Sequence, residues 1–220
     1  MFAHDDERAV IFEIHPTEGR LVKGFAMGDG PVRGDFEGIA YAEERFYLVT
    51  SAGRIYESRE GEDNERMLYN TYGTGVGKKC EVEGLTFEPA NRSLLLVCKT
   101  PRDDEIENFL AIYRFSLDTR EVAGEPLLVP LNEITDRINE KAFRPSGIER
   151  HPVTGNYVVI AAQQSAMVEI TPAGRVVAIV DLKRRNHRQV EGITFASSGT
   201  LVLVDEGGNR RARLTLYEIP

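Results

Sequence analysis

Residues 190–195 read Val-Glu-Gly-Ile-Thr-Phe, and nearly the same string occurs twice more, at 82–87 (Val-Glu-Gly-Leu-Thr-Phe) and at 36–41 (Phe-Glu-Gly-Ile-Ala-Tyr). A fourth, related string, Ser-Gly-Ile, stands at 146–148. Successive anchors are separated by 46, 63 and 45 residues. A period of about 40–50 residues is typical of four-stranded propeller blades. The repeat therefore predicts a β-propeller, and the long interval indicates an insertion.

Each repeat continues in the same way after its anchor. A turn rich in Pro, Gly or Asn leads into a strongly apolar second strand, and a third and a fourth strand follow. The second strands are expected at 45–51, 93–99, 156–162 and 200–206. Their unbroken apolar runs favour strands that are buried on both faces between neighbouring blades.

The two ends of the chain enter this pattern part-way. Residues 1–28 match the second, third and fourth strands of a blade, and the chain stops after a third strand at Pro220. We therefore expect one all-β domain over 1–220, a five-bladed propeller whose first and last blades lack one strand each. We also expect the natural start to lie upstream of Met1. A short helix is predicted near 131–142, with Asn132 as its N-cap.

Composition excludes several classes of protein. The net charge of -8 argues against nucleic acid as the main partner, because a phosphate backbone needs a clustered basic face. The one dense basic run, Lys-Arg-Arg-Asn-His-Arg at 183–188, is interpreted as a solvated loop. No window is long and apolar enough for a membrane span, and no signal peptide follows Met1. As given, the chain is expected to be a soluble monomer.

The two cysteines, Cys80 and Cys98, fall in one expected hairpin. A single bridge between them is compatible with this placement, but nothing in the sequence requires it.

The glutamates of the anchor strings are in phase with the core. Side chains alternate along a strand, so each Glu shares a face with the hydrophobic residues two and four positions later. The first strand of a propeller blade is innermost, so these carboxylates should converge on the central channel. Converging carboxylates need a cation, a proton or a basic side chain between them. Ca²⁺ accepts 6–8 oxygen ligands from such scattered groups.

Acidic residues at the ends of the outermost repeats should reach the same region, whereas Lys99 in the third blade could neutralise part of the charge. The predicted metal ligands are Glu37, Glu83, Glu191, Asp6, Asp205 and Glu206, with Asp5 beside them. A second interpretation remains open: each Glu could instead accept hydrogen bonds from the backbone of the next blade and serve only to join the blades.

The chain resembles the SdiA-regulated β-propeller family, which is distantly related to NHL-repeat propellers. The strings that carry the resemblance are KKCEVEGLTFEPANRSLLLVCK (78–99), FRPSGIERHPVTGNYVVIAAQQSAMVEITPAGRVVAIVDL (143–182) and RQVEGITFASSGTLVLVDE (188–206). The resemblance implies a five-bladed propeller with a bound calcium ion and an undefined biochemical role. It also implies a periplasmic or other extracytoplasmic location if an upstream signal or anchor is present. Without such a segment, the cytoplasm is expected. The family's opening Ser-Gly strand is absent here. Its second strands tend to end in acids, which this chain keeps only in the first and last blades.

Calcium at a propeller axis can also serve catalysis, by polarising a carbonyl or activating water. Such a site needs a general base, and His4, beside Asp5 and Asp6, is the one candidate. His15 and His151 precede prolines at turns, and His187 is interpreted as solvated in the basic loop. Residues 73–79 resemble a phosphate-binding loop only superficially and are interpreted as a flexible connector.

We therefore expect a non-enzymatic calcium-binding propeller that presents a face to an unknown ligand or protein, with no catalytic residue assigned. Two alternatives stay open: a calcium-dependent esterase or lactonase that uses the channel, and a protein-interaction propeller without metal.

Overall fold

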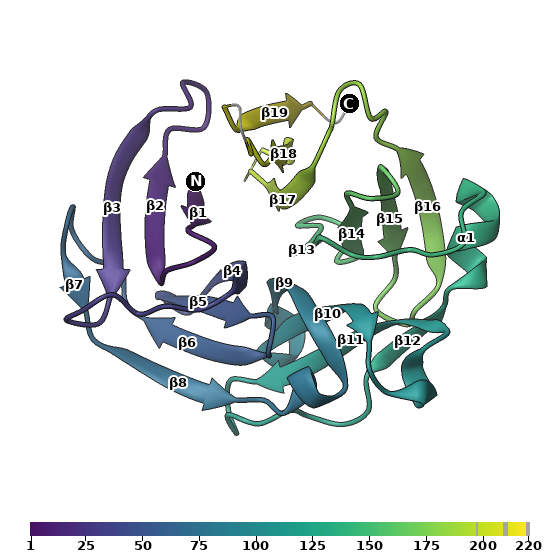
Figure 1. Cartoon of the computed structure of the whole chain (residues 1–220), viewed down its shortest axis with the longest axis horizontal. Helices are drawn as coiled ribbons and strands as arrows, with labels where there is room; N and C mark the ends of the chain where they lie inside the picture. The colour runs from purple at the N-terminus through teal and green to yellow at the C-terminus, as the bar shows by residue number, and fades with distance from the viewer. Residues whose placement is uncertain (197, 209–210, 219–220) are drawn as a thin grey trace.

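The fold was analysed in a computed structural model, which describes residues 1–196, 198–208 and 211–218. Five small β-sheets surround a central axis as blades (Figure 1). The predicted five-bladed β-propeller is therefore confirmed. No helix in the described part of the chain is long and apolar enough to cross a membrane.

The three middle blades each contain four antiparallel strands, with the first strand of each next to the axis (Figure 1). Their strands are β4 (Phe36–Ala42), β5 (Arg45–Thr50), β6 (Arg54–Ser58) and β8 (Tyr69–Gly73); β9 (Cys80–Glu88), β10 (Ser93–Pro101), β11 (Phe109–Ser116) and β12 (Leu127–Pro130); β13 (Gly147–Arg150), β14 (Tyr157–Ala161), β15 (Ala166–Ile170) and β16 (Val176–Asp181). The anchor strings thus lie in the inner strands, as the repeat predicted.

The first blade takes its strands from two places in the sequence. It consists of β1 (Phe2–His4), β2 (Val10–Ile14), β3 (Leu21–Met27) and β7 (Arg66–Met67). The three N-terminal strands were expected. The two-residue strand β7 was not, and it pairs parallel with the outer edge of β3. The sequence pattern missed it because two residues carry no periodicity.

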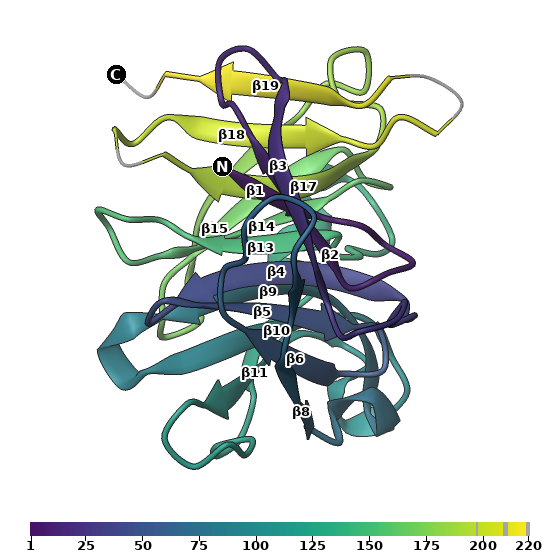
Figure 2. The same ribbon diagram turned by 90° about the vertical axis from the view of Figure 1, so that its left-hand side faces the viewer.

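The last blade has the three strands that were expected. They are β17 (Val190–Phe195), β18 (Leu201–Asp205) and β19 (Arg213–Tyr217). The side view shows them one above another at the edge of the ring (Figure 2).

The inserted helix α1 (Asn132–Ile138) is shorter than predicted. Leu131, not Asn132, occupies the N-cap position, and no side chain caps this end. The helix stops at Asn139, which adopts a left-handed conformation with φ 55° and donates its N–H to the Thr135 carbonyl. Ile134 is fully buried against the third and fourth blades, so the apolar face of the insertion anchors it.

The second strands are buried on both faces, as predicted. In β10, Leu94 and Leu96 pack in one cluster with the second blade, whereas Leu95 and Val97 pack in another with the fourth. Because successive side chains point to opposite faces, one continuous apolar run supplies two blade–blade interfaces.

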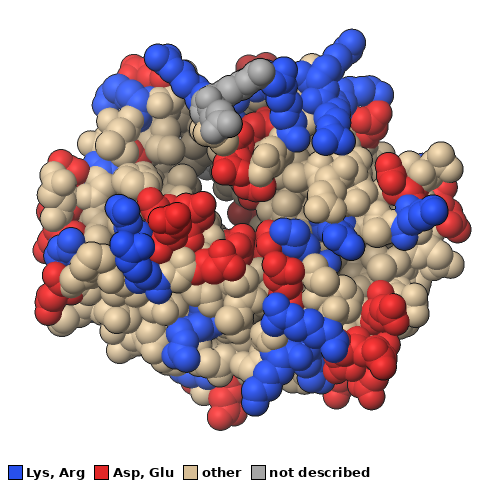
Figure 3. Space-filling view, viewed as in Figure 1, with Lys and Arg blue, Asp and Glu red and all other residues tan. Residues whose placement is uncertain are grey.

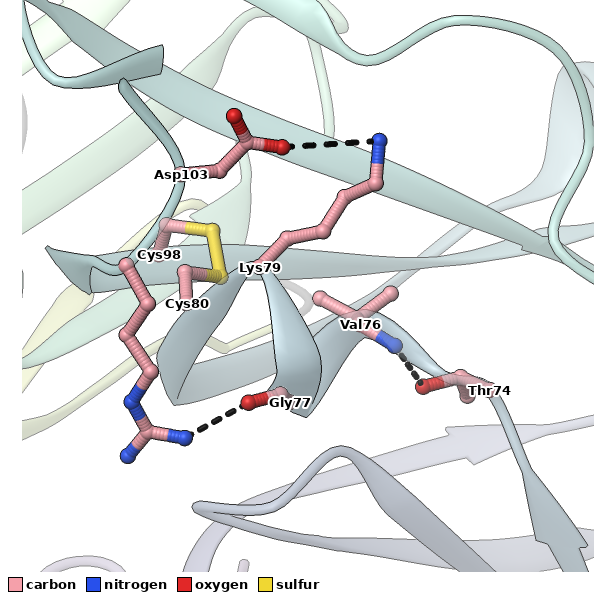
Figure 4. The surroundings of a disulfide bond; sticks show 8 residues. Thr74, Val76, Gly77, Lys79, Cys80, Cys98 and Asp103 are labelled. Carbon is pink, nitrogen blue, oxygen red and sulfur yellow. Dashed lines mark hydrogen bonds and ion pairs between the residues drawn. A yellow bond between two sulfur atoms is a disulfide. The ribbon is translucent and has the colours of Figure 1, made fainter. Parts of the chain in front are cut away.

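Cys80 in β9 and Cys98 in β10 form a disulfide (Figure 4). The short 3-10 turn Val76–Lys78 lies beside this bond, and Val76 is buried. Arg102 donates to the Gly77 carbonyl over 2.6 Å. The segment 73–79 is therefore a turn between two blades in which Val76 is buried and the other side chains are partly or fully exposed, and it does not open an α-helix.

Candidate functional site: an acidic channel

Carboxylates gather around the centre of the propeller. The space-filling view shows a hollow there with Asp and Glu side chains on several sides (Figure 3). Glu37 and Glu191 are the second residues of the inner strands β4 and β17, and Glu83 is the fourth residue of the inner strand β9. The charge of Glu83 raises the pKa of both Glu37 and Glu191, which indicates that the three carboxylates lie within reach of one another's charge.

Glu83 is the best neutralised member of the set. The ammonium of Lys99 donates to Oε1 of Glu83 over 2.7 Å, and only 9% of the Glu83 side chain is exposed. Burial raises the pKa of Glu83 above its ordinary value, while Lys99 opposes that rise. The expectation that Lys99 balances part of the channel charge agrees with this contact.

Glu37 has no such partner. Burial, followed by the charges of Glu83 and Asp35, raises the pKa of Glu37 to about 8. The more distant ammonium of Lys99 lowers it only in part. Near neutral pH this carboxyl therefore holds a proton in the folded protein or requires a cation beside it.

Glu191 lies at the exposed rim of the channel. It accepts a hydrogen bond of 3.0 Å from the side-chain amide of Gln189, which also donates to Glu206. Desolvation by the channel wall raises the pKa of Glu191, and the charge of Glu206 raises it further. Gln189, which the sequence patterns did not single out, therefore joins the two predicted ligands Glu191 and Glu206.

The N-terminal acids border the same region. The carbonyl of Asp6 accepts from the backbone of Phe36, which places Asp6 beside the start of β4. Asp5 instead caps its own turn by accepting from the N–H groups of Glu7 and Arg8. Asp35, which immediately precedes the second anchor strand and was missed in the sequence, accepts from Ser51 over 2.6 Å and acts on Glu37.

Asp205 is engaged elsewhere. Its Oδ2 lies 2.8 Å from Nδ1 of His187, and its Oδ1 accepts from the backbone N–H of Gln189. His187 Nε2 lies 2.6 Å from the hydroxyl of Tyr217 in β19. Asp205 is 4% exposed and thus belongs to a buried chain of hydrogen bonds in the last blade. Its role as a metal ligand stays a prediction, and these contacts do not favour it.

The interpretation of His187 as solvated was wrong, because its exposure is 1%. The other residues of the basic run 183–188 are exposed, as expected. His187 is buried because the loop leads into β17 next to Asp205, the last residue of β18, to which the His187 ring is hydrogen-bonded. Only the pairing of β17 with β18 reveals this partner.

The remaining histidines divide as the sequence suggested. His15 and His151 each accept backbone N–H groups through Nδ1 at turns. His4, in β1, has its pKa lowered by burial, with the Asp5 carbonyl and the charges of Asp6 and Asp5 opposing that shift.

The channel glutamates bond to other side chains and not to the backbone of a neighbouring blade, as far as the described residues show. No backbone N–H of the described residues donates to the carboxylates of Glu37, Glu83 or Glu191. Ser146, at the corresponding place in the fourth blade, does make such a link, because its hydroxyl donates to the Val190 carbonyl of β17 over 2.7 Å. These contacts do not favour the interpretation of the Glu residues as acceptors for the backbone of the next blade, which stays a prediction, whereas Ser146 makes such a link.

The fit of a metal ion to the channel is incomplete in the present side-chain arrangement. Among the described residues, no group of three or more His, Cys, Asp or Glu side chains is close enough together to hold an ion. The donor chemistry suits a hard cation, since the converging groups are carboxylate oxygens with raised pKa values. Binding would require these carboxylates to draw together.

A cleft of about 570 Å³ adjoins the channel through Lys99. It lies between the end of β10 and helix α1, and its wall is mixed, with three basic side chains and the acidic Glu107 among polar and apolar residues. Its lining includes Lys99, Asn108, Thr135, Lys141, Phe143 and Arg144. Lys99 thus stands between the acidic channel and this cleft.

Solved structures share this architecture at low sequence identity. The glutaminyl cyclase of Myxococcus xanthus is 16% identical, with a TM-score of 0.61 over 99% of this chain and 87% of that one. A Bacteroides caccae protein of unknown function is 15% identical, with a TM-score of 0.54 over 97% of this chain and 71% of that one. The virginiamycin B lyase of Staphylococcus aureus is 15% identical, with a TM-score of 0.51 over 98% of this chain and 65% of the lyase. At such identities the likeness shows the fold alone.

Comparison with family models yields one assignment. The model described as SdiA-regulated matches residues 1–215. None of the curated proteins compared with the chain matches it.

Proposed function

Because this chain belongs to the SdiA-regulated family, and because its inner strands aim three carboxylates into one channel, we propose that it is a non-enzymatic propeller that binds a calcium ion at its axis and presents one face to a ligand or protein. The observation that carries the proposal is the poorly compensated cluster around Glu37. A divalent cation would replace the mutual repulsion of these groups with attraction and stabilise their ionised forms.

Glu37, Glu83 and Glu191 would hold the ion, with Asp6 and Glu206 within the same acidic region. The ion would supply charge neutralisation and a fixed link between the inner strands of three blades. Lys99 competes with it for Glu83, which favours a site of modest affinity. The cleft beside Lys99 supports the second half of the proposal, since a ligand there would respond to the charge of the channel.

The decisive experiment is a thermal melt in EDTA against the same melt in millimolar calcium. At a calcium concentration of 100 times the dissociation constant, preferential binding stabilises the folded state by about 2.7 kcal/mol. For a chain of this size the melting temperature should rise by roughly 5–10 °C. The rise should be lost in Glu37→Gln/Glu191→Gln and kept in Glu140→Gln, an exposed control. Identical melts in calcium and EDTA would overturn the proposal and favour an interaction propeller without metal.

A calcium-dependent esterase or lactonase is the second candidate, and one observation favours it. Burial lowers the pKa of His4, which keeps its imidazole neutral and able to accept a proton near neutral pH. A hydrolase should turn over p-nitrophenyl acetate or a γ-lactone only with calcium, and Glu83→Gln and His4→Gln should each abolish turnover. Calcium-dependent stability without turnover would leave the non-enzymatic function in place.

We further propose an extracytoplasmic location. The Cys80–Cys98 disulfide supports it, because such bonds persist mainly in oxidising compartments.

A further inference from the structure

The insertion between the third and fourth blades is a folded part of the molecule. It comprises helix α1 and the segment 139–146, which runs inward from the helix to β13 (Figure 1). Ile134 and Phe143 are buried in the core that the third and fourth blades share. Both of these blades already have four strands without the insertion. Its role therefore lies outside the strand pairing of the blades.

The insertion forms one wall of the cleft of about 570 Å³ that Lys99 also lines, and the end of β10 with the residues before β11 forms the other wall. The backbone N–H of Leu131 donates to the Asn108 carbonyl over 2.9 Å, which ties the two walls together. The backbone N–H of Arg144 donates to Oε1 of Gln164 over 3.0 Å, which holds the end of the insertion against the fourth blade. The cleft is therefore held open by the fold, and its size is typical of sites for small organic molecules.

The basic side chains of the insertion wall have no counter-charge. Lys141 and Arg144 are exposed, and neither forms an ion pair with another residue in the described part of the chain. The third cation, Lys99, already donates to Glu83. The acid of the lining, Glu107, lies on the other wall, just before β11. The insertion wall thus favours an anionic group.

The rest of the lining favours an organic anion over an inorganic one. Leu131 and Phe143 contribute apolar surface beside the two cations, and Asn108 and Asn132 contribute side-chain amides. A guanidinium such as that of Arg144 binds a planar carboxylate through two parallel hydrogen bonds. A hydrated inorganic ion would leave the apolar part of the lining uncovered.

We propose that this cleft binds a small organic carboxylate, with the carboxylate held by Arg144 and Lys141 and the apolar part of the ligand against Leu131 and Phe143. The inference rests on the ligand-binding face of the proposed function and names the chemistry of that ligand. It does not require the calcium ion, because none of these four residues lies in the channel.

Lys99 would link the cleft to the channel. An ammonium that turns toward a bound carboxylate leaves Glu83, which can then contact a cation in the channel. Calcium at Glu83 would in turn release Lys99 to the cleft. Each ligand should therefore strengthen the binding of the other, and by the same factor, as thermodynamic linkage requires.

The test is a saturation-transfer NMR titration of the full chain in EDTA, with 3-phenylpropionate as the probe and 3-phenylpropanamide as its uncharged match. The carboxylate should bind at least about tenfold more tightly than the amide, and 0.5 M NaCl should weaken its binding because the contact is ionic. Lys141→Gln/Arg144→Gln should weaken carboxylate binding about tenfold and leave the amide unaffected. Arg137→Gln, at an exposed arginine of α1 outside the cleft lining, should change neither.

Three results would overturn the proposal whether or not the variants fold. The first is equal binding of the carboxylate and the amide, and the second is no binding of the carboxylate at about 10 mM, which is weaker than any affinity expected of a specific site. The third is displacement of the carboxylate by an equal concentration of sulfate, which would show that the cleft accepts an adventitious ion only.

A repeat of the titration in millimolar calcium tests the link through Lys99. The affinity for the carboxylate should rise at least about threefold in the wild type and stay unchanged in Lys99→Gln. Unchanged affinity in a wild-type protein that calcium stabilises would overturn the link. Because the first titration is made in EDTA, its outcome is independent of the calcium melt. Carboxylate binding without a calcium response in the melt would reject the proposed metal site alone.

Discussion

The ammonium of Lys99, near the end of β10, donates to the carboxylate of Glu83, in the first half of β9, over 2.7 Å. This contact gives the third blade its own counter-charge at the channel. Glu37 and Glu191 occupy equivalent places in the second and fifth blades and have no such partner among the described residues. The channel is therefore neutralised on one side and strongly acidic on the others.

Replacing Lys99→Gln should weaken the apo protein and strengthen calcium binding. Without the ammonium, the nearly buried Glu83 loses its charged hydrogen bond, which should cost about 1–2 kcal/mol of unfolding free energy in EDTA. A competing positive charge is also removed, so the calcium affinity measured by calorimetry should rise at least about threefold. Lys183→Gln is the control, since its pair with Asp181 is exposed and should contribute less than about 1 kcal/mol. Equal effects of the two substitutions would contradict the assigned role of Lys99.

Stability should fall as the pH rises from 5 to 8. The pKa of Glu37 is about 8 in the folded protein against 4.5 for a free side chain. Between these values the folded state binds more protons than the unfolded state, so its advantage is complete below pH 4.5 and is lost as the pH rises through 8. Burial of Glu149, which raises its pKa to about 7, acts in the same direction. The lowered pKa of His4 acts oppositely at the acid end of the range.

Urea unfolding at pH 5, 6, 7 and 8 measures this dependence. In the wild type the free energy of unfolding should drop by about 1–2 kcal/mol over the range, allowing for solvent screening in the channel. Glu37→Gln should flatten the profile, and Glu140→Gln should leave it unchanged. If the free energy of unfolding of the wild type rises toward pH 8, ionisation of Glu37 does not destabilise the folded protein.

Reduction of the Cys80–Cys98 bond should destabilise the third blade. The bond joins two residues that are 18 positions apart. By restricting the unfolded chain, a bond across such a loop stabilises the folded state by about 3 kcal/mol. A melt in dithiothreitol should therefore occur roughly 6–12 °C below the melt of the oxidised protein. The Cys80→Ala/Cys98→Ala variant should melt low in either condition. Two free thiols in the untreated protein would show that the bond does not form.

The hydrogen-bonded chain from Asp205 through His187 to Tyr217 should hold the edge strand β19 in place. Asp205→Asn removes a buried charged acceptor and should cost about 2–3 kcal/mol, whereas Tyr217→Phe removes one hydroxyl and should cost about 0.5–1.5 kcal/mol. Hydrogen exchange should accelerate first in β19. Asp181→Asn, at an exposed aspartate, serves as the control. If Asp205→Asn lowers the free energy of unfolding no more than the control does, these hydrogen bonds do not stabilise the last blade.

The repeat of the anchor strings was sufficient to predict five blades, the buried second strands and the convergence of Glu37, Glu83 and Glu191. These features follow from local rules, because neighbouring residues in the sequence determine which side chains share a face of a strand and where turns occur. The short helix was predicted on the same basis, although its bounds and cap were not.

Only the tertiary structure decided which groups meet across the sequence. It turned His187 toward Asp205, paired Lys99 with Glu83, closed the disulfide and brought β7 beside β3. These contacts depend on how strands pair and how blades pack around the axis, which no window of neighbouring residues specifies. The sequence by itself therefore determined the repeating unit and the residues that face the channel. The packing of the ring determined which of those residues are neutralised.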